Sequence, residues 1–214
     1  MKQTALGRAS AAILTATMAL TLSLASHAED DELPIAPDEF VYCTVCHGVQ
    51  LMGNRNIDAP RLSGMAPWYV EQQLNSFKNG WRGAHAEDLV GMEMRPMAAA
   101  LTDQEIAAVA QFVQATQSPH PAVSIEGDVE SGRQLYAPCI ACHGANAEGN
   151  EALGAPALTG IDDWYLVRQL ENYQTGIRGS HPGDVYGMQM RASVGLLRDK
   201  QAIDDVVRYI TTLK

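Results

Sequence analysis

The chain of 214 residues is short of basic side chains, with 15 Lys and Arg against 25 Asp and Glu and a formal net charge of −10. Nucleic acid is therefore an unfavourable partner, because its phosphates would repel the chain. After the N-terminal region, no apolar run approaches the ~20 residues that a membrane-spanning helix needs. A β-hairpin pattern is also missing. These absences argue against a nucleic-acid-binding protein, an integral membrane protein and a β-rich fold.

The N-terminal region has the pattern of a secretory signal peptide. Lys2 and Arg8 precede an Ala- and Thr-rich apolar stretch, 11–25, and Ala28 is followed by the acidic run 29–32. The stretch is too short for a membrane anchor. We expect residues 1–28 to be removed, which leaves 186 residues with a net charge of −12, because the segment holds two basic and no acidic side chains. The mature protein is then exported to the periplasm.

The mature chain contains a long internal repeat. Shifted by 96 positions, segment 43–95 aligns without a gap with 139–191, and 23 of 53 positions are identical. This repeat has the size of a small globular domain. We expect an N-terminal domain at 29–118, a linker at 119–123 and a C-terminal domain at 124–214. Each domain is small for a purely hydrophobic core and would gain stability from a buried prosthetic group.

Helix signals dominate both copies. Segments 68–79 and 164–175 carry apolar residues at helical spacing, and a glycine follows each. Residues 102–105 form a capping-box sequence before another apolar repeat, and Asp199 opens the matching run in the second copy. Both domains are therefore expected to be mainly helical, with long Gly-rich loops.

All four cysteines occur in two Cys-x-x-Cys-His motifs, at 43–47 and 139–143. Paired cysteines in an exported protein can form a disulfide, and such a pair can also be half of a zinc site. The adjacent histidine favours a third interpretation, because the five-residue pattern marks attachment of c-type haem. We expect two covalently bound haem c groups. The thioether residues are Cys43, Cys46, Cys139 and Cys142, and the axial iron ligands are His47 and His143.

A second axial ligand is expected among the methionines that the two copies share. Seven methionines follow the signal peptide, and only the pairs Met92/Met188 and Met94/Met190 are repeated. A thioether ligand raises the reduction potential and suits an electron carrier. The other methionine of each pair would fill a gap in the core. The repeat alone leaves both pairs open.

Two charged loops are also repeated. Arg82 and Arg178 are suited to charge-assisted hydrogen bonds with haem propionates. His85 and His181 lie in the same loops. These histidines would give a bis-histidine iron if they were ligands, and they otherwise stabilise the loops.

Repeated prolines and tryptophans complete the candidate haem environment. A carbonyl at Pro60 and Pro156 could accept a hydrogen bond from Nδ1 of the axial histidine, although a turn would also explain the prolines. The neighbouring aromatic pairs Trp68-Tyr69 and Trp164-Tyr165 would pack on the porphyrin or fill the core.

These motifs resemble the dihaem class I c-type cytochromes of the cytochrome c4 type. The similarity rests on the two Cys-x-x-Cys-His motifs, on WYVEQQLNSFKNGWRG and WYLVRQLENYQTGIRG, and on the methionines ahead of the last helices. In that family the ligand methionine lies seven residues before a leucine, which selects Met94 and Met190. The resemblance also implies haem-binding roles for Pro60, Pro156, Arg82 and Arg178.

The resemblance implies an all-α fold of two tandem class I cytochrome c-like domains, each a few helices wrapped around one haem. It also implies a periplasmic electron carrier, not an enzyme, that passes single electrons from a membrane respiratory complex to a terminal oxidase or reductase. Two alternatives stay open: an electron-accepting subunit of a dehydrogenase complex, and a dihaem enzyme of the peroxidase or thiosulfate-oxidising type. The acidic surface favours basic redox partners or simply keeps the protein soluble. Peripheral membrane association is left open.

The two copies differ at both ends. The second has a complete leading helix sequence, DVESGRQLYAPC, whereas Pro34 and Pro37 limit any helix before the first motif. This difference weakens the case for packing of the first helix on the last in the N-terminal domain. The second copy also has one residue more between Asp199 and Ile203 than the first has between the matching positions, so the register of its last helix is less fixed.

Overall fold

The computed structural model describes residues 36–213. The predicted signal peptide, residues 1–28, lies outside the described residues. Within 36–213 the structure contains helices and no β-sheet, with isolated bridges only at Asn54–Ala59 and Asn150–Ala155. The all-α prediction is therefore confirmed. No helix in this part of the chain has both the length and the apolar character needed to cross a membrane.

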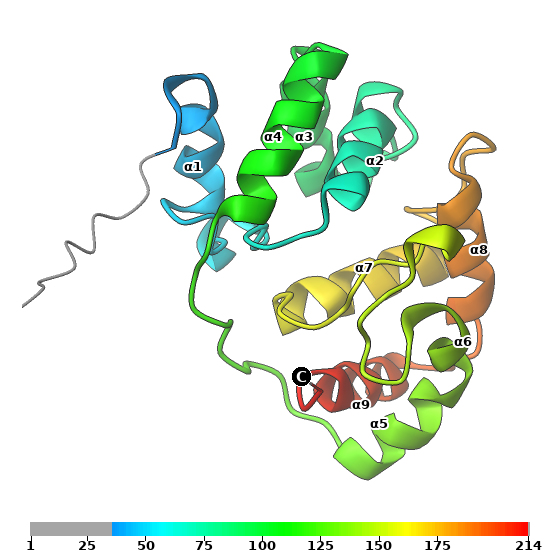
Figure 1. Ribbon diagram of the computed structural model, residues 1–214. Coiled ribbons are helices and arrows are strands. Elements are labelled where there is room, and N and C mark those ends of the chain that lie inside the picture. The colour runs from blue at the N-terminus through cyan, green and yellow to red at the C-terminus, as the bar shows by residue number, and fades with distance from the viewer. Residues whose placement is uncertain (1–35, 214) are drawn as a thin grey trace, which may run out of the picture. The chain divides into compact units, whose positions relative to one another are not determined.

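The two copies of the repeat form two lobes, joined by a segment without helices at 116–128 (Figure 1). We call residues 36–115 lobe 1 and residues 129–213 lobe 2. The helices of lobe 1 are α1 (Val41–His47), α2 (Pro67–Lys78), α3 (Leu89–Ala99) and α4 (Asp103–Ala115), with 3₁₀ turns η1 (Asp38–Phe40) and η2 (Arg55–Ile57). Those of lobe 2 are α5 (Val129–Tyr136), α6 (Ile140–His143), α7 (Asp163–Thr175), α8 (Val185–Val194) and α9 (Lys200–Ile210), with η3 (Ala137–Cys139) and η4 (Glu151–Leu153).

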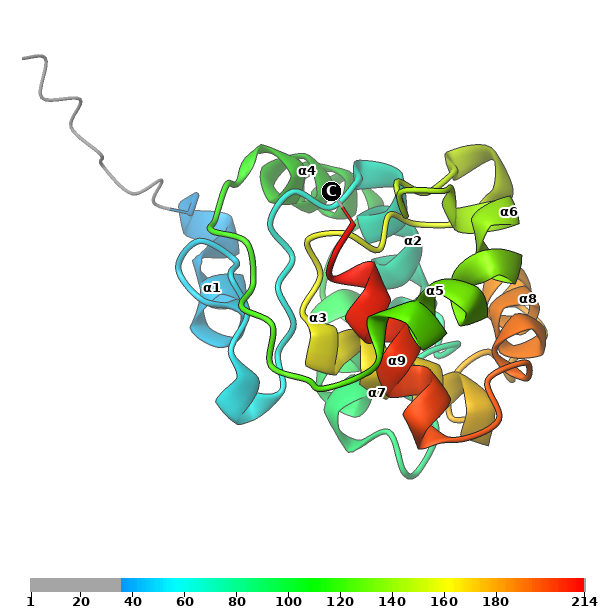
Figure 2. The same cartoon turned by 90° about the horizontal axis from the view of Figure 1, so that it is seen from below.

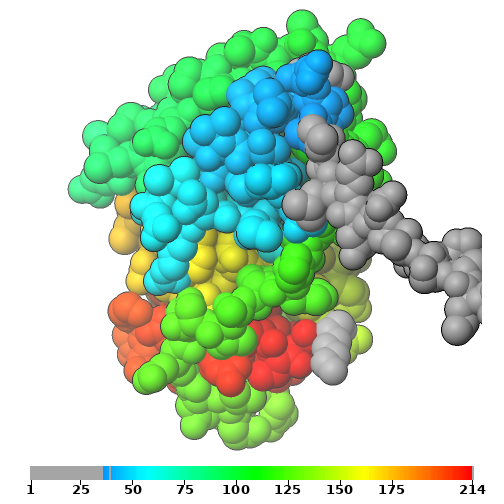
Figure 3. Space-filling model, turned by 90° about the vertical axis from the view of Figure 1, so that its left-hand side faces the viewer, coloured from blue at the N-terminus to red at the C-terminus, as the bar shows by residue number. Residues whose placement is uncertain are grey.

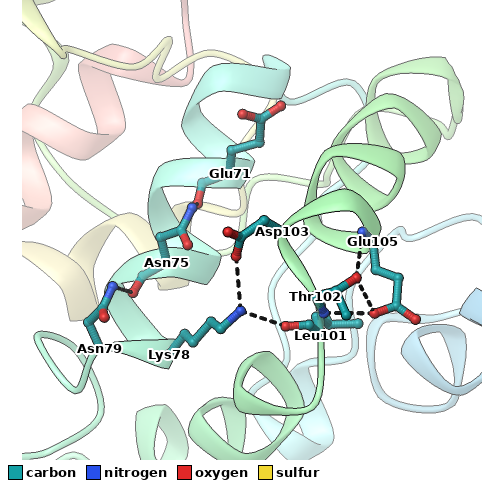
Figure 4. Close-up of polar contacts among 8 residues, drawn as sticks. All are labelled: Glu71, Asn75, Lys78, Asn79, Leu101, Thr102, Asp103 and Glu105. Atoms are coloured by element: carbon teal, nitrogen blue, oxygen red, sulfur yellow. Dashed lines mark hydrogen bonds and ion pairs between the residues drawn. The ribbon is translucent and has the colours of Figure 1, made fainter.

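The predicted cap of the last helix in lobe 1 is present. The Thr102 hydroxyl accepts from the Glu105 backbone N–H, and the Glu105 carboxylate accepts from the Thr102 N–H, which completes a capping box. Lys78 of α2 donates to the Leu101 carbonyl at 2.7 Å and pairs with Asp103 at 3.1 Å (Figure 4). The start of α4 is thereby fastened to the end of α2.

The last helix of lobe 2 shows where the additional residue lies. Asp199 caps α9 by accepting from the Ala202 N–H at 2.9 Å, so it takes the place of Thr102. The prediction that the insertion falls between Asp199 and Ile203 is wrong, because both caps stand four residues before a buried isoleucine, Ile106 or Ile203. The additional residue is Arg198, ahead of the cap.

The leading helices differ as the sequence indicated, although one contact is common to both lobes. In lobe 2, α5 lies beside α9 in both Figure 1 and Figure 2. Tyr136 packs on Tyr209 with ring centroids 5.6 Å apart. Lobe 1 has only the turn η1 ahead of α1, yet Phe40 stacks on Phe112 of α4 at 5.7 Å. One aromatic pair thus joins the start and end of each lobe.

One buried arginine ties lobe 1, lobe 2 and the connecting segment together. The Arg61 guanidinium donates to the carbonyls of Ser63 (2.7 Å), Gly160 (2.8 Å) and Ser118 (3.0 Å). Its backbone N–H donates to the Asp162 carboxylate at 2.7 Å. Burial lowers the pKa of Arg61, and Asp162 opposes that effect. The second copy has alanine at the matching position, so this clamp is not part of the repeat.

The connecting segment has a second anchor. The Asp163 carboxylate accepts from the Ser124 hydroxyl at 2.7 Å and from the Ile125 N–H at 3.0 Å. Burial raises the pKa of Asp163, but these hydrogen bonds outweigh burial and the pKa is lowered. Figure 3 shows the segment as green spheres on the molecular surface. The predicted linker, 119–123, falls inside it.

We predict that Arg61→Ala destabilises the junction between the lobes. Removal of the guanidinium leaves three buried or part-buried carbonyls without a donor, with an expected loss of about 2–4 kcal/mol. Differential scanning calorimetry of the holoprotein should show a lower transition temperature. The exposed Arg198 supplies the matched control, and equal effects of Arg61→Ala and Arg198→Ala would contradict the prediction.

Candidate haem sites

The loop after each Cys-x-x-Cys-His motif has the same backbone path in both lobes. Leu51 and Ala147 occupy the matching left-handed position, with φ of 52° and 57°. Backbone hydrogen bonds from Leu62 N–H to Leu51 and from Leu158 N–H to Ala147 measure 2.9 and 2.8 Å. The sequence repeat therefore produces a structural repeat around each histidine.

Both motif histidines are buried and oriented by a proline carbonyl. Nδ1 of His47 hydrogen-bonds to the carbonyl of Pro60 at 2.7 Å, and Nδ1 of His143 to that of Pro156 at 2.8 Å. The contact suggested for these prolines is thus present. Burial lowers the pKa of both histidines, although the carbonyls oppose it. A neutral ring that donates through Nδ1 keeps a free lone pair on Nε2, which can bind a metal.

The four cysteines are free and line two separate crevices. Crevice 1 has a cavity volume of about 320 Å³ and holds Cys43, Cys46 and His47 in its wall. Crevice 2, of about 200 Å³, holds the matching residues Cys139, Cys142 and His143. In each lobe the first cysteine is part-buried and the second is exposed. The structure contains no disulfide among these four.

The zinc interpretation also finds no support. In residues 36–213 no group of three or more His, Cys, Asp or Glu side chains is placed to hold a metal ion. Burial raises the pKa of Cys43 and Cys139. Neutral thiols facing an apolar crevice fit addition to the vinyl groups of a porphyrin better than they fit a thiolate cluster.

The crevice walls are mainly apolar, and most of their residues occupy matching positions of the two lobes. Crevice 1 is lined by Leu51, Val70, Leu74, Phe77, Leu101, Val109 and Val113. Crevice 2 is lined by Leu158, Leu166, Leu170, Tyr173, Val194, Leu197, Val206 and Ile210. Such a lining suits a flat apolar macrocycle.

The structure separates the members of each methionine pair. Met94 and Met190 line crevices 1 and 2 and pack against the cores of their lobes. Met92 and Met188 are 36% and 46% exposed and are not among the lining residues. Each crevice is therefore lined by one motif histidine and by one methionine of the repeated pairs.

The repeated arginines meet in a wall shared by the two crevices. The guanidinium of Arg82 donates to Gln73 of its own lobe at 2.6 Å and to Gln169 of lobe 2 at 3.2 Å. Arg178 makes the reciprocal pair, to Gln169 and to Gln73, both at 2.8 Å. Tyr165 accepts from Arg82 at 3.2 Å. The wall therefore has the internal symmetry of the sequence repeat.

No carboxylate of the described residues forms an ion pair with either arginine of this shared wall, although Asp88 lines crevice 1 and Asp184 lines crevice 2. Arg82 and Arg178 are each 7% exposed, and their hydrogen-bond acceptors are neutral amide or phenol oxygens. The Nε atoms of both arginines are buried without any hydrogen-bond partner. Although burial raises the pKa of Tyr165, the two arginines outweigh it and lower the pKa. Two unpaired buried cations fit the carboxylates of haem propionates, which would neutralise them.

Of the two predicted aromatic pairs, the tyrosines and not the tryptophans provide the aromatic part of this wall. Tyr69 and Tyr165 line both crevices, whereas Trp68 and Trp164 line neither. Trp164 lies instead under Arg168, 5.3 Å from the ring centroid. The expectation that the tryptophans pack in the haem environment is corrected, because a one-residue step on a helix turns the side chain by about 100°.

The repeated loop histidines lie away from the crevices. His85 and His181 are exposed and line neither cavity. His181 stacks on Trp81 of lobe 1 with centroids 6.1 Å apart. The bis-histidine alternative therefore lacks a geometric basis.

One functional pair escaped the sequence analysis, namely Gln73/Gln169. The glutamine is identical in the two copies, so the repeat contained the signal. Neutral helix residues give no indication of chemistry until they are seen beside the buried arginines.

Comparison with known proteins shows the family to which the chain belongs. The profile of the cytochrome c family matches residues 40–117 and again 129–214. The chain is 31% identical over 84% of its length to the thiosulfate dehydrogenase electron acceptor of Stutzerimonas stutzeri, covering 86% of that protein. It is 32% identical over 80% of its length to cytochrome c4 of Thiocapsa roseopersicina, covering 86% of it.

A solved structure of a cytochrome c4 is also similar to this chain. Cytochrome c4 of Acidithiobacillus ferrooxidans superimposes with a TM-score of 0.67 at 26% identity, covering 81% of this chain and 99% of the other. The two matched domains and the two Cys-x-x-Cys-His motifs identify the cofactors as two covalently bound haem c groups. The chain therefore belongs to the cytochrome c family and carries two of its domains, as its dihaem cytochrome c4 relatives do.

Proposed function

We propose that this protein is a periplasmic dihaem electron carrier that passes single electrons from a membrane respiratory complex to a terminal oxidase or reductase. The observation that carries the proposal is the duplicated crevice, in which a buried histidine and a methionine line an apolar cavity in each lobe. When bound, haem c supplies the one-electron Fe(III)/Fe(II) couple. The functional domains are taken as 29–118 and 124–214, with export directed by residues 1–28.

The proposed anchors and ligands are the same in both lobes. His47 and His143 would bind the iron through Nε2, while Pro60 and Pro156 hold the rings in place through Nδ1. The Met94 and Met190 thioethers would be the second protein ligands. Cys43, Cys46, Cys139 and Cys142 would attach each haem covalently in its crevice. Two protein ligands to each iron would leave no position for a substrate, so no catalytic step is assigned.

Arg82 and Arg178 are proposed to hold the propionates at the shared wall. Each arginine contacts glutamines of both lobes, so the anionic edges of the two groups would face one another. The buried cations would favour the reduced state, because the ferric state carries one more positive charge. The wall therefore influences both reduction potentials.

Partners are proposed from charge and from the relatives. The net charge of −12 expected for the mature chain would guide docking to redox proteins with basic surfaces.

A second candidate function is supported by the names of some relatives. The Stutzerimonas stutzeri relative is named the electron acceptor of a thiosulfate dehydrogenase. This chain would then accept electrons from a dehydrogenase rather than from a membrane complex. Purification from its native source in a stoichiometric complex with such an enzyme would favour this candidate, and isolation as a free protein would favour the first.

The carrier function is tested by an optical redox titration of the holoprotein together with carbon monoxide. We expect two one-electron steps and no carbon monoxide complex of the reduced protein, because both iron positions are filled. A high-spin haem that binds carbon monoxide would contradict the proposal and favour a dihaem enzyme.

The ligand assignment predicts different effects for neighbouring methionines of lobe 2. Met190→Leu should remove about half of the weak near-infrared band that reports methionine bound to ferric iron, because one of two sites loses its thioether. Met188→Leu should leave the band unchanged, since Met188 is not among the residues that line crevice 2. The reverse pattern would assign the ligand to Met188.

The wall predicts a change in potential. Arg178→Gln should lower the reduction potential of at least one haem by tens of millivolts, on the order of 1 kcal/mol, because a buried cation that disfavours ferric iron is lost. Arg191→Gln, at an exposed position of the same lobe, is the control. Equal potentials in the wild type and Arg178→Gln would show that Arg178 has no influence on either haem.

A further inference from the structure

Crevice 1 contains more thioethers than crevice 2. Met65, Met94 and Met97 all line it, whereas crevice 2 is lined by a single methionine among the described residues, Met190. The positions that match Met65 and Met97 in the second copy are Ile161 and Ser193. The repeat therefore keeps one methionine in both crevices and adds two in lobe 1.

Met97 is placed to take over the role proposed for Met94. The two residues are three positions apart on α3, a spacing that puts their side chains on one face of the helix. Both line crevice 1, together with Val90 of the same helix. Met94 packs against the core of lobe 1, whereas Met97 is 40% exposed. The second sulfur thus lies along the same face, nearer to solvent.

The helix is weakened between these two methionines. Pro96 lies inside α3. Proline has no N–H, so the carbonyl of Met92 loses its helical hydrogen bond, and the ring crowds that carbonyl. The matching residue of α8 is Ala192, which keeps the helix regular. Lobe 1 therefore has two features that lobe 2 lacks: a second crevice methionine, Met97, and a proline that weakens the helix beside it.

We propose that Met97 is a second iron-ligand position of lobe 1, which binds when the Met94 thioether is lost. This inference rests on the proposed assignment of Met94 and Met190 as the primary ligands. One iron–sulfur bond breaks and another forms, with no change in charge or oxidation state. Lobe 2 has Ser193 at this place and has no substitute. Loss of the primary ligand therefore opens lobe 2 to external ligands and leaves lobe 1 closed.

The test compares four variants of the full-length holoprotein: Met94→Leu, Met97→Leu, Met190→Leu and the double variant Met94→Leu/Met97→Leu. Leucine preserves the volume of methionine and cannot bind iron. The measurements are the near-infrared band of the ferric protein and carbon monoxide binding by the ferrous protein. Haem content and circular dichroism verify that each variant is folded.

The expected results distinguish the two lobes. Met190→Leu loses about half of the band and binds one carbon monoxide per molecule. Met94→Leu and Met97→Leu each keep the full band and bind none. The double variant behaves as Met190→Leu does, because crevice 1 has then lost both thioethers of α3.

Three results would overturn the inference, and they separate it from the proposed function. If Met94→Leu loses half of the band as Met190→Leu does, the assignment of Met94 and Met190 as ligands is supported and the proposed role of Met97 is refuted. If the double variant keeps the full band, Met65 rather than Met97 supplies the sulfur. If Met190→Leu keeps the full band, the ligand assignment itself fails and this inference fails with it.

Discussion

The structure depends on how two buried guanidinium groups, Arg82 and Arg178, are neutralised. Each lies 7% exposed in the wall between the crevices, with neutral acceptors and an unpartnered Nε. Burial of an unpaired charge costs several kcal/mol, and none of the ion pairs among the described residues involves either guanidinium. We propose that the propionates of the two haem groups neutralise these guanidinium groups. Haem binding and the stability of the contact between the lobes would then depend on the same two side chains.

Lobe 1 and lobe 2 share the residues of their crevices but differ in the contacts around them. The histidine, its proline carbonyl and the crevice methionine occur in both, as do the arginine and glutamine of the wall. Other features occur in one lobe only. Lobe 1 has Arg61 and the methionines beside Pro96, and lobe 2 has the complete helix α5. The crevice residues are thus shared by the two copies, whereas the contacts that support them differ.

Features that depend on short stretches of sequence could be predicted. The haem motifs, the capping box at Thr102 and the helix boundaries follow from short patterns, and the repeat reduced seven methionines to two pairs. Contacts between the lobes could not be predicted, because Gln73 and Gln169 become significant only when two helices distant in sequence meet. The choice of Tyr69 over Trp68 depends on helix rotation about its axis, which apolar pattern alone does not determine.

The central claim is that each lobe is completed by its own covalently bound haem. Mass spectrometry of tryptic peptides from the purified holoprotein tests it most directly, because Cys43 and Cys46 fall in one peptide and Cys139 and Cys142 in another. We predict that both peptides carry the mass of one haem. A peptide without haem, or one closed by a disulfide, would contradict the account.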